Sequence, residues 1–344
     1  MGRGAHSKRG GMAMIIEPSV LTAHMQRMAE EEAQYVIGMD EMALRLATHI
    51  AARGLMAGPS LPWAKTQEII RFNPGALSVW AGINGHGKSL LLGQVALWWM
   101  GQRQTVVLAS LEMKPEETLY RMSRQMLGRN IELGEFETPI KALRDHLWIY
   151  DQNDSVAADR ILALVHYAAN ELGADHIVID SLTKCGLSRD DYTAQARFVD
   201  KLQWAAKRHN VHVHLVCHMR KGSDERGGSP GKFDIRGAAE VTDLADNVLV
   251  VYRNKAKELA EEKRRGMGFL SDAEKTALQD PDSFLTVEKN REHGHEARFG
   301  LWYHNGAMQF LGSDTPHAMV WEKAPPEWKG AAARAQMLAA GAVA

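Results

Sequence analysis

The sequence predicts an α/β fold built on a mainly parallel, twisted β-sheet with helices on both faces. Two observations predict this fold. Short apolar segments rich in β-branched residues alternate along the chain with longer segments of helical periodicity. The connections between successive strands are also long enough to hold a crossover helix, which parallel pairing requires.

The same patterns place the individual elements. Strands are expected at 77–81, 105–110, 147–150, 176–180, 211–218 and 247–252. Helices are expected between them at 89–100, 115–127, 157–172 and 194–209. Two further strand-like segments, 283–289 and 297–304, precede an Asn-Gly turn and a last apolar segment at 308–311. We expect these segments to extend the sheet as an antiparallel C-terminal edge.

Composition sets broad limits on the class of protein. The chain has 344 residues, of which 45% are hydrophobic and 24% charged, which is ordinary for a globular enzyme. Its net charge is -1, so any contact with nucleic acid has to come from a local basic segment. It has two cysteines without metal-ligand spacing, and no apolar segment approaches the ~20 residues that cross a bilayer. Without a secretory signal, a cytoplasmic protein with no membrane partner is expected.

Three regions are expected along the chain. Residues 1–60 contain a basic, glycine-rich tail and a helical pattern at 19–57, which Gly38 interrupts. The α/β domain is expected at 61–325, after a proline-containing linker. Residues 326–344 form an alanine-rich C-terminal tail.

A phosphate-binding loop is predicted directly after the first strand. Gly82 to Ser89 fit the pattern G-x-x-x-x-G-K-[ST] at every fixed position. The glycines allow backbone N–H groups to converge on phosphate oxygens, and the following helix adds positive potential at its N-terminus. Lys88 would reach the β- and γ-phosphates, and the Ser89 hydroxyl would bind Mg²⁺. The expected nucleotide-binding residues are Asn84, Gly85, His86, Gly87, Lys88, Ser89 and Leu90.

Two carboxylates follow other strands of the predicted sheet. Asp180 ends an apolar strand, where ligands of open α/β sheets bind, and we expect it to bind Mg²⁺. An aspartate that caps the next helix is the alternative. Glu112 leaves another strand and could orient the water that attacks ATP. Spacing alone does not distinguish that function from an exposed acid at a helix start.

Together these segments resemble the hexameric replicative DNA helicases, the DnaB family and its bacteriophage relatives. The resemblance implies a RecA-like P-loop NTPase core that uses ATP, or another nucleoside triphosphate, and Mg²⁺. It covers about 61–311. The segments that carry it are 80–89, 110–113, Asp180 with 215–221, 234–240, 244–246 and 251–254.

The resemblance assigns functions that the residues alone do not. It implies that Glu112 is the catalytic base and that His218 senses the γ-phosphate. Lys289 and Arg291 are similar to a pair of cations that reach the ATP of a neighbouring subunit, where they would stabilise the transition state. Without the resemblance, His218 would be a buried structural histidine and Arg291 a surface cation.

The adenine and DNA sites are also implied by the resemblance. Arg253 and His304 correspond to residues on either side of the base, although the family usually has an aromatic ring where His304 stands and Tyr303 could replace it. A glycine-rich basic segment after His218 resembles the loop that grips single-stranded DNA, with sequence-independent, salt-sensitive contacts. A solvated loop without a ligand is the alternative. The expected DNA-binding residues are Arg220, Lys221, Arg226, Lys232 and Arg236.

The expected activity is therefore a replicative DNA helicase. It would form a homohexameric ring, assembled with or without DNA or nucleotide, and move 5′ to 3′ at replication forks. Primase or DNA polymerase partners and a phage origin in a bacterial cytoplasm are expected, without a primase domain because only about 60 residues precede the motor. Two rival functions stay open: a recombinase-like filament, and an ATP-switched DNA-binding or loading module in which Glu112 would be dispensable.

Overall fold

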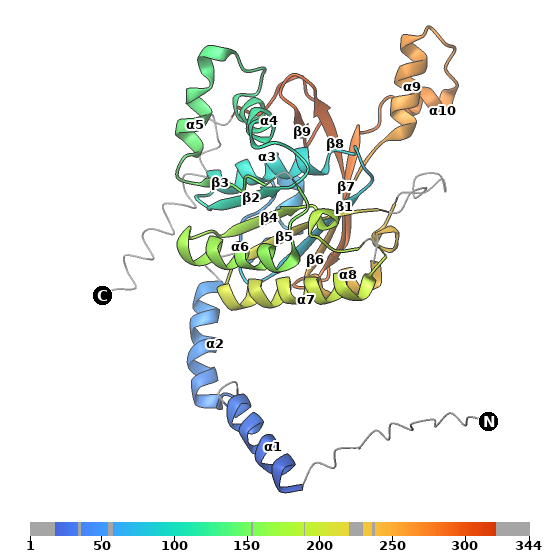
Figure 1. Cartoon of the computed structure of the whole chain (residues 1–344). Coiled ribbons are helices and arrows are strands. Elements are labelled where there is room, and N and C mark those ends of the chain that lie inside the picture. Colours follow the sequence, from blue (N-terminus) through green and yellow to red (C-terminus); the bar gives the residue numbers. More distant parts are fainter. Residues whose placement is uncertain are drawn as a thin grey trace, which may run out of the picture. The chain divides into compact units, whose positions relative to one another are not determined.

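The computed structural model describes residues 18–33, 36–53, 58–152, 154–188, 190–219, 230–235 and 238–320 (Figure 1). The chain divides into two units, Met1–Met56 and Ala57–Ala344. No helix in the described ranges has both the length and the apolar character that a membrane span requires.

The first unit contains two helices, α1 (Pro18–Ala33) and α2 (Met39–Arg53). Gly38 lies between them, as the sequence predicts. The first turn of α2 contains acidic residues, which the helix dipole favours. Its apolar side chains are nevertheless exposed: Leu44 is 71% exposed and Ile50 is 62% exposed. Apolar side chains of α1 are exposed as well, Met25 by 58% and Met28 by 45%.

The second unit is built on a sheet of nine strands within the described residues, in the order β3-β2-β4-β5-β1-β6-β7-β8-β9. The strands are β1 (Leu77–Gly82), β2 (Val106–Ser110), β3 (Leu147–Ile149), β4 (His176–Asp180), β5 (His212–His218), β6 (Asn247–Arg253), β7 (Ser283–Asn290), β8 (Ala297–His304) and β9 (Gln309–Leu311). Pairing is parallel from β3 to β6 and antiparallel from β6 to β9. The predicted parallel sheet with an antiparallel C-terminal edge is confirmed, and each strand end agrees to within one residue.

Helices cover both faces of this sheet (Figure 1). On one side lie α3 (Lys88–Gly101) and α4 (Pro115–Leu127), and on the other α6 (Ala158–Glu171) and α7 (Tyr192–His209). The other helices are α5 (Glu137–Leu143), α8 (Ala238–Leu244), α9 (Lys255–Arg265) and α10 (Asp272–Ala277). Single 3₁₀ turns lie at Ala64–Thr66, Leu133–Glu135, Leu182–Lys184 and Lys232–Asp234.

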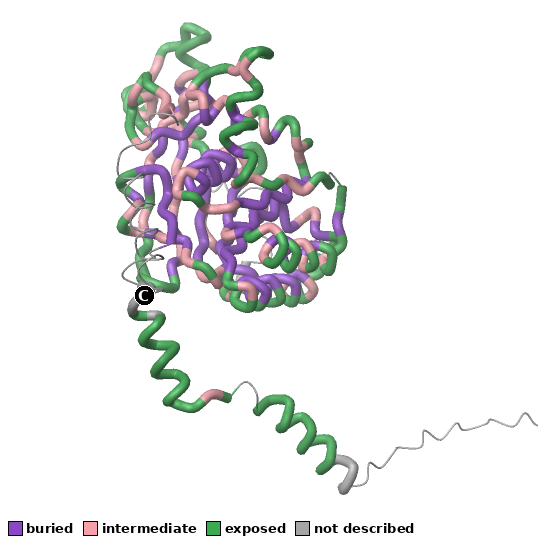
Figure 2. The backbone as a smooth tube through the Cα atoms, turned by 90° about the vertical axis from the view of Figure 1, so that its left-hand side faces the viewer, coloured by how far each residue is buried: buried purple, intermediate pink, exposed green. Residues whose placement is uncertain are grey.

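Strand β1 is covered on both faces of the sheet and lies in the buried interior, which is purple in Figure 2. Val79 and Ala81 pack into a core with α6 and α7, whereas Trp80 packs into a second core with α3 and α4. Successive side chains of a strand point to opposite faces, so a strand covered on both sides is mostly apolar. The buried polar residue of β1, Ser78, is hydrogen-bonded to His212 and Asn247. All six residues of β1 are buried. The phosphate loop therefore follows a central, rigid strand.

Helices α9 and α10 lie in the connection between β6 and β7 and were not predicted from the sequence. Helix α9 is highly charged, and only Lys257 and Ala260 are buried, so it lacks the apolar periodicity by which helices are recognised. Its N-cap is Asn254, which accepts a hydrogen bond from the Lys257 N–H. Helix α10 begins with a capping box formed by Ser271 and Glu274. These caps are the sequence signals that could have revealed both helices.

Candidate active site

The sheet brings the phosphate loop and three of the predicted site residues, Glu112, Asp180 and His218, to one edge. Strands β1, β2, β4 and β5 are parallel, so their carboxyl ends lie together. The phosphate loop follows β1, Glu112 follows β2, Asp180 ends β4 and His218 ends β5. In the register of the sheet, Gly82 pairs with His218. Residues that are far apart in the sequence therefore meet beside the phosphate loop.

Close packing explains two of the three glycines of this loop, Gly82 and Gly87, and a φ of 78° explains Gly85. Gly87 caps α3 with a φ of 89°, in the left-handed region, and a Cβ there would lie 3.0 Å from Cζ of Phe310. A Cβ on Gly82 would lie 2.2 Å from the carbonyl oxygen of Val251. Asn84 and Gly85 are exposed where the loop turns. The backbone N–H groups at the start of α3 are thus open to an anion.

The Lys88 side chain is buried against the same loop. Its Nζ donates to the carbonyl oxygens of Gly82 at 2.9 Å and Ile83 at 3.0 Å. Burial lowers the pKa of Lys88, while the nearby carboxylates of Asp180 and Glu112 raise it. The ammonium is therefore held between the loop and two acidic groups, where it can pair with phosphate oxygens.

Asp180 and Ser89 provide the oxygen atoms expected of a magnesium site. Asp180 is buried, and burial raises the pKa of its carboxyl group. A side-chain hydrogen bond with Ser89 opposes that shift, as does the charge of Lys88. Magnesium prefers oxygen ligands such as carboxylates, and it usually keeps several waters in addition. A buried carboxylate in contact with the loop hydroxyl fits this ion.

Glu112 is the centre of a hydrogen-bond network. Its Oε1 accepts from Ser181 Oγ at 2.6 Å and lies 3.1 Å from His218 Nε2. Ser181 Oγ is also 3.2 Å from His218 Nε2 and 2.7 Å from Thr183 Oγ1. These contacts, that of His218 first, lower the pKa of Glu112 to about 2. Glu112 is therefore an ionised hydrogen-bond acceptor, and no pattern in the sequence indicates Ser181 as its partner.

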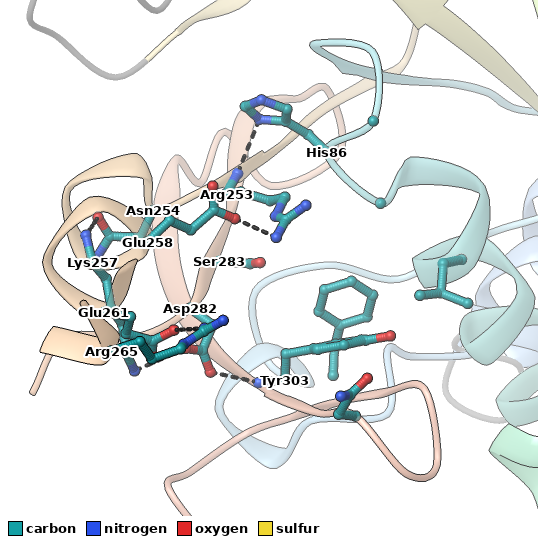
Figure 3. Close-up of a pocket in the computed structure, with 15 residues that line it drawn as sticks. His86, Arg253, Asn254, Lys257, Glu258, Glu261, Arg265, Asp282, Ser283 and Tyr303 are labelled. Carbon is teal, nitrogen blue, oxygen red and sulfur yellow. Dashed lines mark hydrogen bonds and ion pairs between the residues drawn. The ribbon is translucent and has the colours of Figure 1, made fainter. Parts of the chain in front are cut away.

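A cavity of about 440 Å³ opens beside the phosphate loop (Figure 3). The predicted residues His86, Leu90 and Arg253 line it, and Tyr303 faces them from β8. His304 is not among its lining residues. The imidazole of His304 instead accepts from the Ala307 N–H at 3.1 Å and lies 3.2 Å from the Pro316 carbonyl oxygen. Of the two neighbouring residues considered for the adenine, Tyr303 lines the cavity and His304 does not, and Phe310 adds a second aromatic ring.

Further contacts shape this pocket. The backbone N–H of Arg253 donates to Nδ1 of His86 at 3.1 Å, which ties the phosphate loop to the end of β6. The Tyr303 ring packs against Phe310 with the ring centroids 5.4 Å apart. Helix α9 adds Lys257 and Glu258 to the lining, and the sequence predicts neither because this charged helix lacks an apolar periodicity.

Lys289 and Arg291 lie at the opposite edge of the sheet. Strand β7 is antiparallel to β6, so Ser283 pairs with Arg253 near the phosphate loop, whereas Lys289 pairs with Val248 near the start of β6. Lys289 Nζ donates to the Asp243 carbonyl oxygen at 3.0 Å. Arg291 forms an ion pair with Asp246 at 2.8 Å. The six residue steps of β7 from Ser283 to Lys289 span about 20 Å. Neither cation therefore reaches the phosphate loop of its own chain.

The candidate DNA segment follows His218 directly. Four of its five predicted cations, Arg220, Lys221, Arg226 and Arg236, lie outside the described residues. Lys232 is described, and its Nζ contacts the Glu288 carbonyl oxygen at 3.2 Å and Glu296 at 3.3 Å. Met219 and Ile235 form an isolated antiparallel bridge at the two ends of the segment. The bridge holds both ends beside His218, but Lys232 is already paired within the chain.

Comparisons with known proteins indicate the family of this chain. The family model described as AAA domain matches residues 42–224. The chain belongs to the AAA domain family. Among curated relatives of this AAA protein, the DNA helicase/primase of Enterobacteria phage T3 is 30% identical over 199 residues, which cover 50% of this chain and 34% of the relative. The Twinkle homolog protein, chloroplastic/mitochondrial, of Arabidopsis thaliana is 23% identical over 256 residues, covering 67% and 35%.

Solved structures show the same fold. A DnaB-like replicative helicase, described with its interactions with primase, aligns with a TM-score of 0.60 and 16% identity over 81% of this chain and 68% of its own. A second solved structure, that of an ATPase domain, aligns with a TM-score of 0.62 and 16% identity over 80% and 99%. The predicted RecA-like fold is confirmed, and the AAA protein shares the fold of the ATPase domain of a DnaB-like helicase. It spans about a third of the length of the two curated relatives.

Proposed function

We propose that this ATPase is the motor of a replicative DNA helicase. It binds ATP with Mg²⁺, translocates 5′ to 3′ on one DNA strand and separates the strands of a fork. The network of Glu112, Ser181 and His218 is the observation that carries the proposal. It joins the group beside the phosphates to the strand end from which the basic segment 219–235 begins.

The coupling step follows from these contacts. Glu112 with a pKa of about 2 is a weak base, because His218 and Ser181 stabilise its carboxylate. A γ-phosphate that attracts the His218 imidazole would remove one of these hydrogen bonds. Glu112 would then become more basic and could orient the attacking water, while the movement of His218 would shift Met219 and the DNA segment.

The metal and the nucleotide would be held by separate groups. Ser89 and Asp180 would hold Mg²⁺, which supplies charge compensation for the β- and γ-phosphate oxygens. Lys88 would bind the same phosphates, and Arg253 and Tyr303 would hold the adenine between a cation and an aromatic ring. Asn84 to Leu90 would line the phosphate side.

A homohexameric ring accounts for the remaining predicted residues. Lys289 and Arg291 lie away from their own phosphate loop, so we propose that they act on the ATP of the next subunit. The exposed apolar side chains of α1 and α2 favour packing of these helices on a neighbour. By analogy with the phage T3 and DnaB-like proteins, we propose single-stranded DNA and forks as ligands, primase or DNA polymerase as partners, and the host cytoplasm of a phage as the location.

Unwinding of a forked DNA substrate tests the proposed function. Wild-type protein with ATP and Mg²⁺ is expected to release the labelled strand, and Lys88→Ala is expected to release none. Glu112→Gln should bind ATP but lose hydrolysis by a factor of about 10² or more. Strand release that does not depend on ATP would refute a motor, and a Glu112→Gln protein with full activity would favour an ATP-switched binding module. ATPase activity and DNA binding without strand release would favour a recombinase-like filament.

A further inference from the structure

Helix α9 stands in a connection that could have been short. Strands β6 and β7 are adjacent and antiparallel, and a hairpin of this kind needs a loop of only about two to five residues. The chain instead places residues 254–282 there, including α9 and α10. Because only two residues of α9 are buried, the helix contributes little to the core. Its charged face is turned to the nucleotide cavity (Figure 3).

One contact of α9 fixes a cation of the cavity. Glu258 forms an ion pair with the guanidinium of Arg253, and Lys255 approaches the same carboxylate at 2.7 Å. The Arg253 side chain is 48% exposed, whereas that of Glu258 is 29% exposed. A half-exposed arginine would otherwise sample many rotamers, so the carboxylate restricts where its guanidinium lies.

A second contact of α9 fixes the opposite wall. Lys257 is buried, and its Nζ forms an ion pair with Asp282 Oδ1 at 2.8 Å. The other oxygen of Asp282 accepts a hydrogen bond from the backbone N–H of Tyr303 at 2.7 Å. Lys257 Nζ also donates to the Asp280 carbonyl oxygen at 2.7 Å. The position of Tyr303 is thereby linked to α9 through one carboxylate.

We propose that α9 positions the clamp for the nucleotide base, with Glu258 holding Arg253 and Lys257 holding Tyr303 through Asp282. This inference rests on the proposed function, in which the adenine lies between Arg253 and Tyr303. Neither Glu258 nor Lys257 needs to touch the phosphates. They set the distance and orientation of the two groups that stack on the base, and so determine how much the base adds to nucleotide affinity.

Steady-state kinetics with a ligand that lacks the base test this proposal. ATPase KM and kcat are measured for wild type, Glu258→Gln and Lys257→Met, together with the inhibition constant of inorganic tripolyphosphate. Both variants should raise KM for ATP by about tenfold, which corresponds to about 1.4 kcal/mol. The kcat should change by less than about threefold, and the inhibition constant of tripolyphosphate should stay at the wild-type value.

Two further variants act as controls. Glu262→Gln removes a charge from α9 at a residue outside the cavity lining and should leave KM unchanged. Lys257→Arg keeps the pairing with Asp282 and should restore most of the affinity that Lys257→Met loses. Thermal melting checks folding, and should Lys257→Met unfold, Glu258→Gln decides the result because its side chain is partly exposed.

The outcomes distinguish a failure of the proposed clamp from a failure of the proposed ATPase function. Wild-type KM values in both Glu258→Gln and Lys257→Met would overturn the positioning of the clamp. A parallel rise in KM and in the tripolyphosphate inhibition constant would also overturn it, because the phosphate site would then be disturbed. Wild-type protein that neither binds nor hydrolyses ATP would instead refute the proposed function.

Discussion

The hydroxyl of Ser181 donates a hydrogen bond of 2.6 Å to Oε1 of Glu112. Ser181 follows the candidate magnesium ligand Asp180, and Glu112 follows the neighbouring strand β2. The bond therefore links the metal side of the site to the carboxylate that is proposed to orient water. Because it stabilises the ionised carboxylate, it lowers the pKa of Glu112 and makes it a weaker base.

Removal of this hydroxyl should raise the rate of hydrolysis in the absence of DNA. In Ser181→Ala the pKa of Glu112 moves part of the way back towards its ordinary value, since the carboxylate is half-exposed and keeps its contact with His218. A more basic Glu112 should increase basal kcat by a factor of about two to five. The measurement is ATPase activity at pH 7.5 with and without single-stranded DNA.

Thr183→Val is the matched control for this prediction. Thr183 donates to the same oxygen of Glu112, but at 3.4 Å, so its removal should change basal kcat much less. Equal basal rates in wild type and Ser181→Ala would show that this hydrogen bond does not control the base.

The position of Arg291 predicts that two inactive variants regain ATPase activity when they are mixed. Arg291→Ala and Lys88→Ala proteins should each lose hydrolysis by about 10³-fold, since one lacks the cation proposed to act on the neighbour and the other the lysine proposed to bind phosphate. When the two proteins are mixed before assembly, about a quarter of the interfaces in a random ring combine an intact Lys88 with an intact Arg291. ATPase activity should therefore reappear in the mixture.

A second mixture controls for subunit exchange itself. Lys88→Ala and Glu112→Gln both damage the pocket of their own subunit, so mixing them should restore nothing. Recovery in that mixture, or no recovery with Arg291→Ala, would contradict an action of Arg291 across the interface.

Substitutions in the basic segment 219–235 should uncouple ATP hydrolysis from DNA binding. Arg220→Ala with Lys221→Ala should abolish DNA stimulation of the ATPase while nucleotide binding stays intact. Loss of two phosphate contacts to a single strand should also reduce the slope of log affinity against log salt by about 1.4. Fluorescence anisotropy with labelled single-stranded DNA measures this slope. Lys201→Ala, which removes an exposed cation from α7, is the control, and unchanged stimulation in the double variant would exclude this segment from the mechanism.

The sequence predicted the elements whose signals are local. The strands are apolar, and the phosphate loop follows one of them, so parallel pairing alone places Glu112, Asp180 and His218 at one edge. The family resemblance then supplied their proposed functions. Long-range partners were not predictable in this way. The hydrogen bond between Ser181 and Glu112 depends on the packing of two strand ends, which no spacing in the sequence encodes.

Two parts of the candidate nucleotide pocket show which features the sequence does not predict. Tyr303 and His304 are neighbours on β8, and successive side chains of a strand point to opposite faces, so an error of one residue exchanges a lining ring for one outside the pocket. Helix α9 was missed because its residues are charged and lie in a connection between strands. Its capping residue Asn254 was visible, but a cap alone does not indicate which face of a helix meets a ligand.

A buried cluster of histidines predicts how stability depends on pH. His176, His212 and His214 lie at or near the starts of β4 and β5, and each ring is hydrogen-bonded within the protein. His212 Nδ1 donates to the Asn73 carbonyl oxygen at 2.6 Å, so its Nε2 accepts from Ser78. Burial lowers the pKa of His212 to about 4, and burial also lowers the pKa values of His176 and His214 well below their ordinary value.

The neutral tautomers of the other two rings follow from the same contacts. Trp80 Nε1 donates to Nδ1 of His214 at 3.1 Å, so His214 Nε2 carries the proton that it donates to Nδ1 of His176 at 3.0 Å. Trp99 stacks on both rings with centroid distances of 4.4 Å. An added proton on His214 would face the donor N–H of Trp80, which explains why the folded state keeps this ring neutral.

The free energy of unfolding should therefore fall as the pH decreases from about 6.5 to about 4. In this range the unfolded chain binds protons at these histidines and the folded chain does not, so acid favours unfolding. His212 alone accounts for a loss of about 3 kcal/mol by pH 4.

Urea unfolding at a series of pH values measures the slope. His176→Phe reduces by one the number of protons that the unfolded chain binds in excess of the folded chain. The slope of the unfolding free energy against pH should therefore fall by about 1.4 kcal/mol per pH unit at low pH, whatever the effect of the substitution on stability at neutral pH. The exposed His317 offers the control, because His317→Gln should leave the slope at the wild-type value. Identical slopes for wild type and His176→Phe would mean that the cluster is already protonated in the folded chain or that water reaches it.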